Sequence, residues 1–133
     1  MSGITHPTYL LDSVAAIARL NEDKAIITLL NTNVLVSIPI IVLGELYAGA
    51  EKSGRVAENI KRVDDFARDR DIVLCDEDTA HEYARVSQQL RKKGRPIPQN
   101  DMWIAALAIQ HNMTLVTRDK HFSQIDGLLL KAW

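Results

Sequence analysis

The chain has 133 residues, of which 47% are apolar and 25% are charged, and its formal net charge is −1. This composition is typical of a globular protein, and it excludes a chain that attracts nucleic acid through an overall basic charge. The length suits one domain, which we expect to span residues 1–133.

Three features of the sequence predict a cytoplasmic protein. Met1–Thr8 lacks the basic and apolar regions of a signal peptide. No apolar run approaches the roughly 18 residues that are needed to cross a membrane. The single cysteine, Cys75, cannot form an internal disulfide, which is in keeping with a reducing compartment.

Short apolar runs alternate with helical patterns along the chain. Strands are predicted in five of these runs, at Thr8–Leu11, Val34–Ile38, Ile72–Cys75, Thr114–Thr117 and Leu128–Lys131. Helices are predicted between them, at Ser13–Leu30 with a division near Asn21, from Pro39 as first helical residue to about Ala50, at Gly54–Arg70, at Glu77–Lys93 and at Asn100–Asn112. Asp76 or Asp78 is expected to cap the fourth of these, Gly94 to end it, and Arg95–Gln99 to form a loop.

This alternation predicts the fold class. Strands that are separated by helices require crossover connections, which produce a parallel sheet. We therefore expect an α/β fold with about five parallel strands and helices on both faces. In such sheets ligands bind beyond the carboxyl ends of the strands.

Four carboxylates are candidates for a site at that edge. Asp12 directly follows the first predicted strand, and Asp119 follows the fourth after one residue. Asp101 lies in the first turn of an apolar helix, and Glu45 lies among apolar residues of another. Each has a plainer explanation when taken alone: Asp12 and Asp119 could be turn or cap residues, Asp101 could favour the helix dipole, and Glu45 could be solvated. Together, with few basic residues to pair them, they favour a hard cation such as Mg²⁺ or Mn²⁺.

Four stretches carry a resemblance to a known family. They are YLLDS (Tyr9–Ser13), GELYAGA (Gly44–Ala50), GRPIPQNDMWIAALAI (Gly94–Ile109) and TLVTRDKHF (Thr114–Phe122). In this order they resemble the motifs of PIN-domain ribonucleases, in particular the VapC toxins of type II toxin–antitoxin systems. The resemblance implies that Asp12, Glu45, Asp101 and Asp119 are catalytic. It implies further that Asp12, Asp101 and Asp119 bind the metal and that Glu45 acts through water.

The resemblance also implies an activity and partners. The expected activity is Mg²⁺-dependent hydrolysis of phosphodiester bonds in single-stranded RNA, with Mn²⁺ able to substitute. The expected partners are a VapB-like antitoxin, bound across the helices of Pro39–Arg70 near Tyr47, Val56 and Phe66, and a second copy of the chain. A PIN-type RNA-processing nuclease without a toxin role and a non-catalytic PIN-like binding module stay open as alternatives.

One residue departs from the family pattern. Ser13 supplies the hydroxyl that usually follows the first aspartate, but Val14 stands where Asn or Ser is common. The departure concerns a supporting hydrogen bond and leaves the metal ligand itself in place.

Six basic residues near the acidic motifs are candidates for RNA contacts. Arg91, Lys92, Lys93 and Arg95 precede Asp101, and Arg118 and Lys120 flank Asp119. Cations could bind phosphates there, but the first group also suits the C-terminus of a helix, and the second could form salt bridges with the acids.

Other features are interpreted as unrelated to catalysis. Leu30–Leu35 (LNTNVL) imitates the opening motif of the family, but Asn31 has no charge for a cation and no helical crossover fits before the next strand. The histidines show no spacing typical of metal ligands and are expected at the surface: His6, His81, His111 and His121. Trp103 is expected in the core or at a dimer interface.

Overall fold

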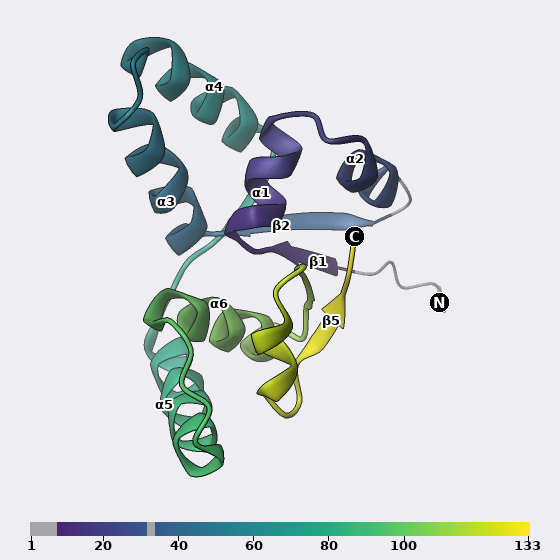
Figure 1. Ribbon diagram of the computed structural model, residues 1–133, viewed down its shortest axis with the longest axis vertical. Helices are drawn as coiled ribbons and strands as arrows, with labels where there is room; N and C mark the ends of the chain where they lie inside the picture. The colour runs from purple at the N-terminus through teal and green to yellow at the C-terminus, as the bar shows by residue number, and fades with distance from the viewer. Residues whose placement is uncertain (1–7, 32–33) are drawn as a thin grey trace.

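The computed structural model describes residues 8–31 and 34–133, and it places five parallel strands in one sheet (Figure 1). The strands are β1 (Thr8–Leu11), β2 (Leu35–Pro39), β3 (Asp71–Val73), β4 (Thr114–Val116) and β5 (Leu129–Lys131). Their order is β3-β2-β1-β4-β5, with Leu10 of β1 in register with Ser37 and Leu115. β1 therefore lies at the centre of the sheet, with β2 and β3 added on one side of it and β4 and β5 on the other.

Helices cover both faces of this sheet, as the sequence predicted. Those in the described residues are α1 (Ser13–Leu20), α2 (Lys24–Leu30), α3 (Ile40–Glu51), α4 (Val56–Arg68), α5 (Glu77–Lys93) and α6 (Gln99–Gln110), with a 3₁₀ turn η1 (Lys120–Gln124). Right-handed crossovers from β1 to β2 and on to β3 place α1–α4 on one face. The connection from β3 back past β1 to β4 runs in the opposite direction, so α5 and α6 cover the other face (Figure 1).

The hydrophobic core lies on both sides of the central strands. Leu10 and Leu11 of β1 and Leu115 of β4 are fully buried. Five consecutive residues of α6, Ile104–Ala108, are also buried, which explains why the sequence of this helix is apolar on all sides. In the part of the chain that the structure describes, no helix is both long and apolar enough to span a membrane.

One predicted division is confirmed and one boundary differs from the sequence-based expectation, each for a physical reason. The predicted division near Asn21 is a complete break, because Glu22 adopts a φ of 60° and Asp23 starts α2 by accepting hydrogen bonds from Ala25 and Ile26. Pro39 was expected as the first helical residue, but it pairs with Val73 at the end of β2 and precedes α3 as its N-cap.

The predicted bounds of β1 and α5 match the structure, and the other boundaries shift by one to two residues. α4 begins at Val56, and β3 begins at Asp71 and ends at Val73. Asp76 caps α5 through a capping box with Thr79, and Gly94 ends it with a φ of 64°, as predicted.

Candidate active site

Asp12 lies at the carboxyl end of β1, where it also begins α1. Its side chain is only 4% exposed and accepts a hydrogen bond from the Ala15 N–H at 2.8 Å. The nearby hydroxyl of Thr117 favours the charged form of this carboxylate and lowers its pKa in part. The backbone N–H of Asp12 donates to the carbonyl oxygen of Val116 at 3.3 Å, which ties the end of β1 to the end of β4. Asp12 therefore has a fixed position at the centre of the sheet edge.

Asp119 and Asp101 approach the same edge from two other segments. Asp119 follows β4 and caps η1, and its backbone N–H donates to the Thr117 hydroxyl at 3.0 Å. Asp101 lies in the first turn of α6 and is mostly buried. Thr117 thus contacts both Asp12 and Asp119. This role has no signal in the sequence, because Thr117 resembles any other β-branched residue at the end of a strand.

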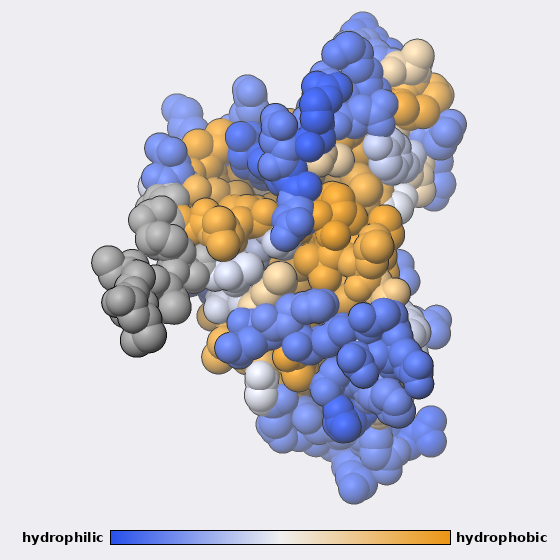
Figure 2. Space-filling view, turned by 180° about the vertical axis from the view of Figure 1, so that it is seen from behind, coloured by the Kyte–Doolittle hydropathy of each residue, from blue (hydrophilic) through white to orange (hydrophobic). Residues whose placement is uncertain are grey.

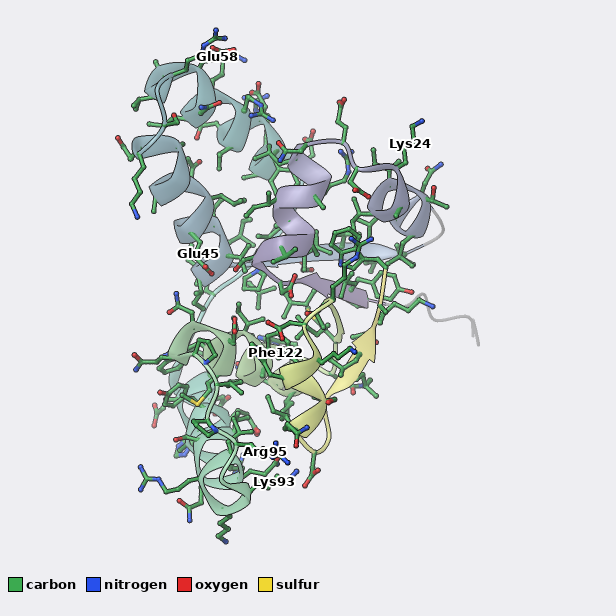
Figure 3. The ribbon with its side chains drawn as sticks, viewed as in Figure 1. Lys24, Glu45, Glu58, Lys93, Arg95 and Phe122 are labelled. Carbon is green, nitrogen blue, oxygen red and sulfur yellow. The ribbon has the colours of Figure 1, made fainter. Side chains whose placement is uncertain are left out.

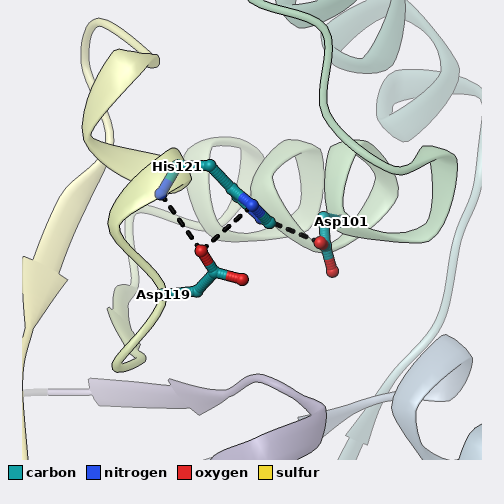
Figure 4. A group of neighbouring side chains, drawn as sticks. All are labelled: Asp101, Asp119 and His121. Carbon is teal, nitrogen blue, oxygen red and sulfur yellow. Dashed lines mark hydrogen bonds and ion pairs between the residues drawn. The ribbon is translucent and has the colours of Figure 1, made fainter.

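His121 lies between Asp101 and Asp119 (Figure 4). Its Nδ1 is 3.0 Å from Asp119 Oδ1, and its Nε2 is 2.9 Å from Asp101 Oδ2. The second contact lacks the alignment of a hydrogen bond, and it becomes an ion pair when the imidazole is protonated. One ligand atom from each of the three residues lies within 4.8 Å of the others, close enough to share a cation.

The expectation that His121 is a surface residue was therefore wrong. The 3₁₀ turn after Asp119 brings a side chain two positions later back over the carboxylate, which a helix or strand would not do. The motif position, two residues after a candidate ligand, was the available signal. His81 and His111 are exposed, as predicted, and His6 lies outside the described residues.

Glu45 approaches the site from the opposite face of the sheet. It is exposed on α3, in the half of the helix that lies nearer to α6 (Figure 3). The Ser13 hydroxyl donates to its Oε1 at 2.6 Å. This bond joins the beginning of α1 to α3 and orients the carboxylate, while Oε2 stays available as an acceptor.

All four acidic residues line one open pocket of about 460 Å³ at the carboxyl edge of the sheet. The other lining residues come from the ends of α1 and α6 and from η1, and they are Ser13, Val14, Pro98, Gln99, Asn100 and Phe122. Val14 exposes its apolar side chain here, so it offers no hydrogen bond where the family commonly has a polar group. Asn31 follows α2 and precedes β2, at the opposite edge of the sheet, and does not line this pocket.

The electrostatics of the pocket suit a cation. Burial is the main reason why the pKa of Asp12 is raised, and the negative charges of Asp101 and Asp119 raise it further. Burial likewise raises the pKa of Asp101, with Asp119 adding to the effect and His121 opposing it. A hard cation would relieve this repulsion between carboxylates, and the oxygen-rich donor set fits Mg²⁺ or Mn²⁺.

The six basic candidates for RNA contacts lie outside the lining of the acidic pocket, as far as the described residues define it. Arg118 donates to the carbonyl oxygen of Trp133 at 2.6 Å and lies 3.5 Å from the centre of its ring. Lys93 binds residues 124 and 126, and Lys93 and Arg95 lie at the end of α5, away from Glu45 (Figure 3). The others, Arg91, Lys92 and Lys120, are exposed.

Trp103 is half-buried and stacks on Tyr83 of α5, with ring centres 4.0 Å apart and planes inclined by 20°. The stack joins α5 to α6. This position agrees with the expected packing role.

Comparison with known proteins places the chain in a family. Residues 9–128 match the PIN domain. Ribonuclease VapC2 of Rickettsia felis is 32% identical over 130 residues, which cover 94% of this chain and 97% of that protein. The crystal structure of VapBC2 from Rickettsia felis, bound to a DNA fragment from its promoter, contains a chain that matches with a TM-score of 0.87, 31% identity and coverage of 95% and 98%. DNA-bound VapBC from Salmonella typhimurium gives a TM-score of 0.88 with 28% identity, covering 96% of this chain and 98% of the other. With its acidic pocket in place, this chain belongs to the PIN-domain family and, within it, to the VapC ribonucleases.

Proposed function

We propose that this protein is a Mg²⁺-dependent endoribonuclease that cleaves single-stranded RNA as the toxin of a VapBC-type pair. The observation that carries the proposal is the convergence of Asp12, Glu45, Asp101 and Asp119 on one pocket. The relatives named as ribonucleases and the VapBC complexes among the structural neighbours support it.

In this proposal the acidic residues divide two tasks. Asp12, Asp101 and Asp119 would hold the metal, which when bound supplies a water of lowered pKa and polarises a phosphoryl oxygen. Glu45 would accept a hydrogen bond from the attacking water through Oε2, since Ser13 already occupies Oε1. Attack by water on the phosphodiester leaves a 5′-phosphate and a 3′-hydroxyl.

Thr117 and Ala15 support this chemistry without taking part in it. The Ala15 N–H holds the Asp12 carboxylate by a hydrogen bond, the Thr117 hydroxyl favours its charged form, and Thr117 also accepts a hydrogen bond from the backbone of Asp119. The two carboxylates are therefore positioned before the metal binds, which lowers the cost of assembling the centre.

A cleavage assay on end-labelled single-stranded RNA tests the activity. EDTA should abolish cleavage, Mg²⁺ or Mn²⁺ should restore it, and the products should carry 5′-phosphates. A matched duplex should be cut much more slowly. Cleavage that persists in EDTA, or products with 2′,3′-cyclic phosphates, would contradict the proposal.

A groove between α1, α3 and α4 supports the proposed antitoxin partner. It has a volume of about 200 Å³ and is mostly apolar, with lining residues Ile17, Leu20, Glu45, Leu46, Gly49, Ala50, Asn59, Arg62 and Val63. Such a groove suits an amphipathic segment of a partner. The VapBC complexes show that relatives bind a partner protein.

The position of this groove corrects part of the sequence-based expectation. Tyr47 and Phe66, near which the partner was expected, are half-buried and pack against the core. Val56 is exposed but does not line the groove. In this proposal the partner would bind along the sides of α3 and α4 that face α1.

The homodimer also stays part of the proposal. Figure 2 shows apolar side chains gathered in a band across the middle of one face. Two exposed apolar residues, Ile40 and Leu74 (63% exposed), directly follow the paired residues Pro39 and Val73 at the ends of β2 and β3, so they lie close together. Light scattering should give the mass of two chains, and Leu74→Asp should yield a monomer. A monomeric wild type would contradict this part.

Two alternatives remain distinguishable by experiment. An RNA-processing nuclease without a toxin role would cleave RNA but would not arrest growth when it is expressed without an antitoxin. A non-catalytic binding module would bind RNA or protein without cleaving. The intact set of four acidic residues favours a catalyst.

A further inference from the structure

Lys93 differs from its basic neighbours because its side chain is bound to another part of the chain. The Nζ atom donates to the Gln124 carbonyl oxygen at 2.6 Å and forms an ion pair with Asp126 at 2.8 Å. One turn earlier in α5, Gln89 Oε1 accepts a hydrogen bond from the Asp126 N–H at 2.6 Å. Two side chains on one face of α5 thus hold residues 124–126.

The segment held in this way carries part of the candidate site. Asp119 caps η1, His121 lies in its first turn, and Gln124 is its last residue. The carbonyl group of Gln124 is at the end of the turn, where a cation is favourable and a partner is needed. Asp119 therefore lies at the first end of η1, and Lys93 holds its last end.

Two kinds of contact fix η1 in complementary directions. Phe122 and Ile125 are buried beneath the turn and hold it on the core. Lys93 and Gln89 instead fix it relative to α5. Because α5 packs along α6, which carries Asp101, one helix supports both sides of the acidic pocket.

We propose that Lys93 is a positioning residue of the metal centre. By holding the η1 turn against α5, it sets the positions of Asp119 and His121 relative to Asp101 and thereby the affinity for the divalent cation. This role rests on the proposed function for the cation itself, and it replaces the RNA contact that the sequence suggested for this lysine.

The charges around Lys93 argue against a main role in RNA binding. Asp126 offsets its positive charge, and two of its three N–H donors are used within the chain. No such internal partner offsets the charge of the neighbouring Lys92 among the described residues, and that lysine is exposed. A phosphate would therefore be attracted more strongly to Lys92 than to Lys93.

Three variants separate these two roles. Lys93→Met removes the charge and the donors but keeps the length of the side chain. Lys92→Met removes the same charge one position away and serves as the matched control. Asp126→Asn breaks the ion pair without removing a positive charge from α5, and because Asp126 is 75% exposed this variant is expected to fold.

The first measurement is amide hydrogen exchange of the metal-free protein. Exchange in residues 119–126 should be faster in Lys93→Met and, to a smaller extent, in Asp126→Asn, and unchanged in Lys92→Met. The second is calorimetric titration with Mn²⁺. Lys93→Met should weaken Mn²⁺ binding by about tenfold, the lower end of the effects known for residues that support metal ligands. Lys93→Arg should restore most of both properties.

The outcomes distinguish the proposal from its rivals. Unchanged exchange and Mn²⁺ affinity in Lys93→Met, together with a higher KM for RNA and a weaker salt dependence, would overturn it in favour of an RNA contact. A wild type that binds no divalent cation would overturn the proposed function and the affinity role together. The exchange data would then still decide whether Lys93 holds the turn.

Discussion

Replacing Asp12 with asparagine separates the charge of this residue from its structural role. Asparagine and aspartate are equally good N-caps, so the hydrogen bond from Ala15 can persist in Asp12→Asn. The metal-free variant should melt at the wild-type temperature or above, because burial and the neighbouring acids disfavour the lost charge. Asp12→Ala should instead lose about 1 kcal/mol with the cap. In a chain of 133 residues this corresponds to a Tm lower by about 3–4 °C.

The pH dependence of this difference follows from the raised pKa of Asp12. Folding favours the protonated form, so the contribution of Asp12 to stability is fully present below its ordinary pKa of 3.8 and is lost as the pH rises through the raised pKa. The Tm of metal-free Asp12→Asn should therefore match that of the wild type in acid. It should exceed the wild-type Tm increasingly as the pH rises towards neutrality. A constant difference across this range would contradict the assignment.

Activity and metal binding complete the test. Both variants should lose RNA cleavage by at least ~10²-fold, the scale of losing one well-placed electrostatic group. Mg²⁺ at ten times its Kd should stabilise the wild type by about 1.4 kcal/mol, or about 5 °C, and should stabilise Asp12→Asn far less. Asn31→Ala should stay within a few-fold of wild-type activity. If Asn31→Ala were inactive while Asp12→Asn still cleaved RNA, the active site would be misplaced.

Three further changes test other parts of the molecule. His121 contacts both Asp101 and Asp119, so His121→Ala should lower the metal-free Tm by removing both contacts; an unchanged Tm would contradict this. In the groove, Ile17→Asp should weaken binding of the cognate antitoxin in a pull-down or calorimetric titration without reducing cleavage. Because Arg118 is held by Trp133, Arg118→Met should change Tm more than the KM for RNA, whereas Lys120→Met should raise KM and weaken its dependence on salt.

The sequence predicts the fold well because its signals are local. Short apolar runs separated by helical patterns define the strands, and the crossover rule then gives parallel strands and helices on both faces. The details that differ depend on single residues. A proline is compatible both with the first position of a helix and with the last position of a strand. Only the pairing of Pro39 with Val73 shows that it ends β2.

The site was predicted only as far as its residues follow strand ends or a known motif. The pairing of Ser13 with Glu45 joins residues 32 positions apart, and Thr117 acts through a buried hydroxyl. Neither leaves a periodic signal. The run of cations at the end of α5 is uniform in sequence, but successive helical residues point about 100° apart, so Lys93 reaches Gln124 while Lys92 is exposed. Such differences arise only from tertiary packing.

The topology explains why such widely spaced residues meet. From β1 the chain adds β2 and β3 on one side of the sheet, and later β4 and β5 on the other side. The helices that follow β1 and β2 therefore cover one face, and the helices that precede β4 cover the other. A crevice opens between them, and Asp12 lies at its base. Glu45 reaches this crevice from α3 on one face and Asp101 from α6 on the other. Glu45 also lines the apolar groove, so a partner seated in that groove would border the acidic pocket.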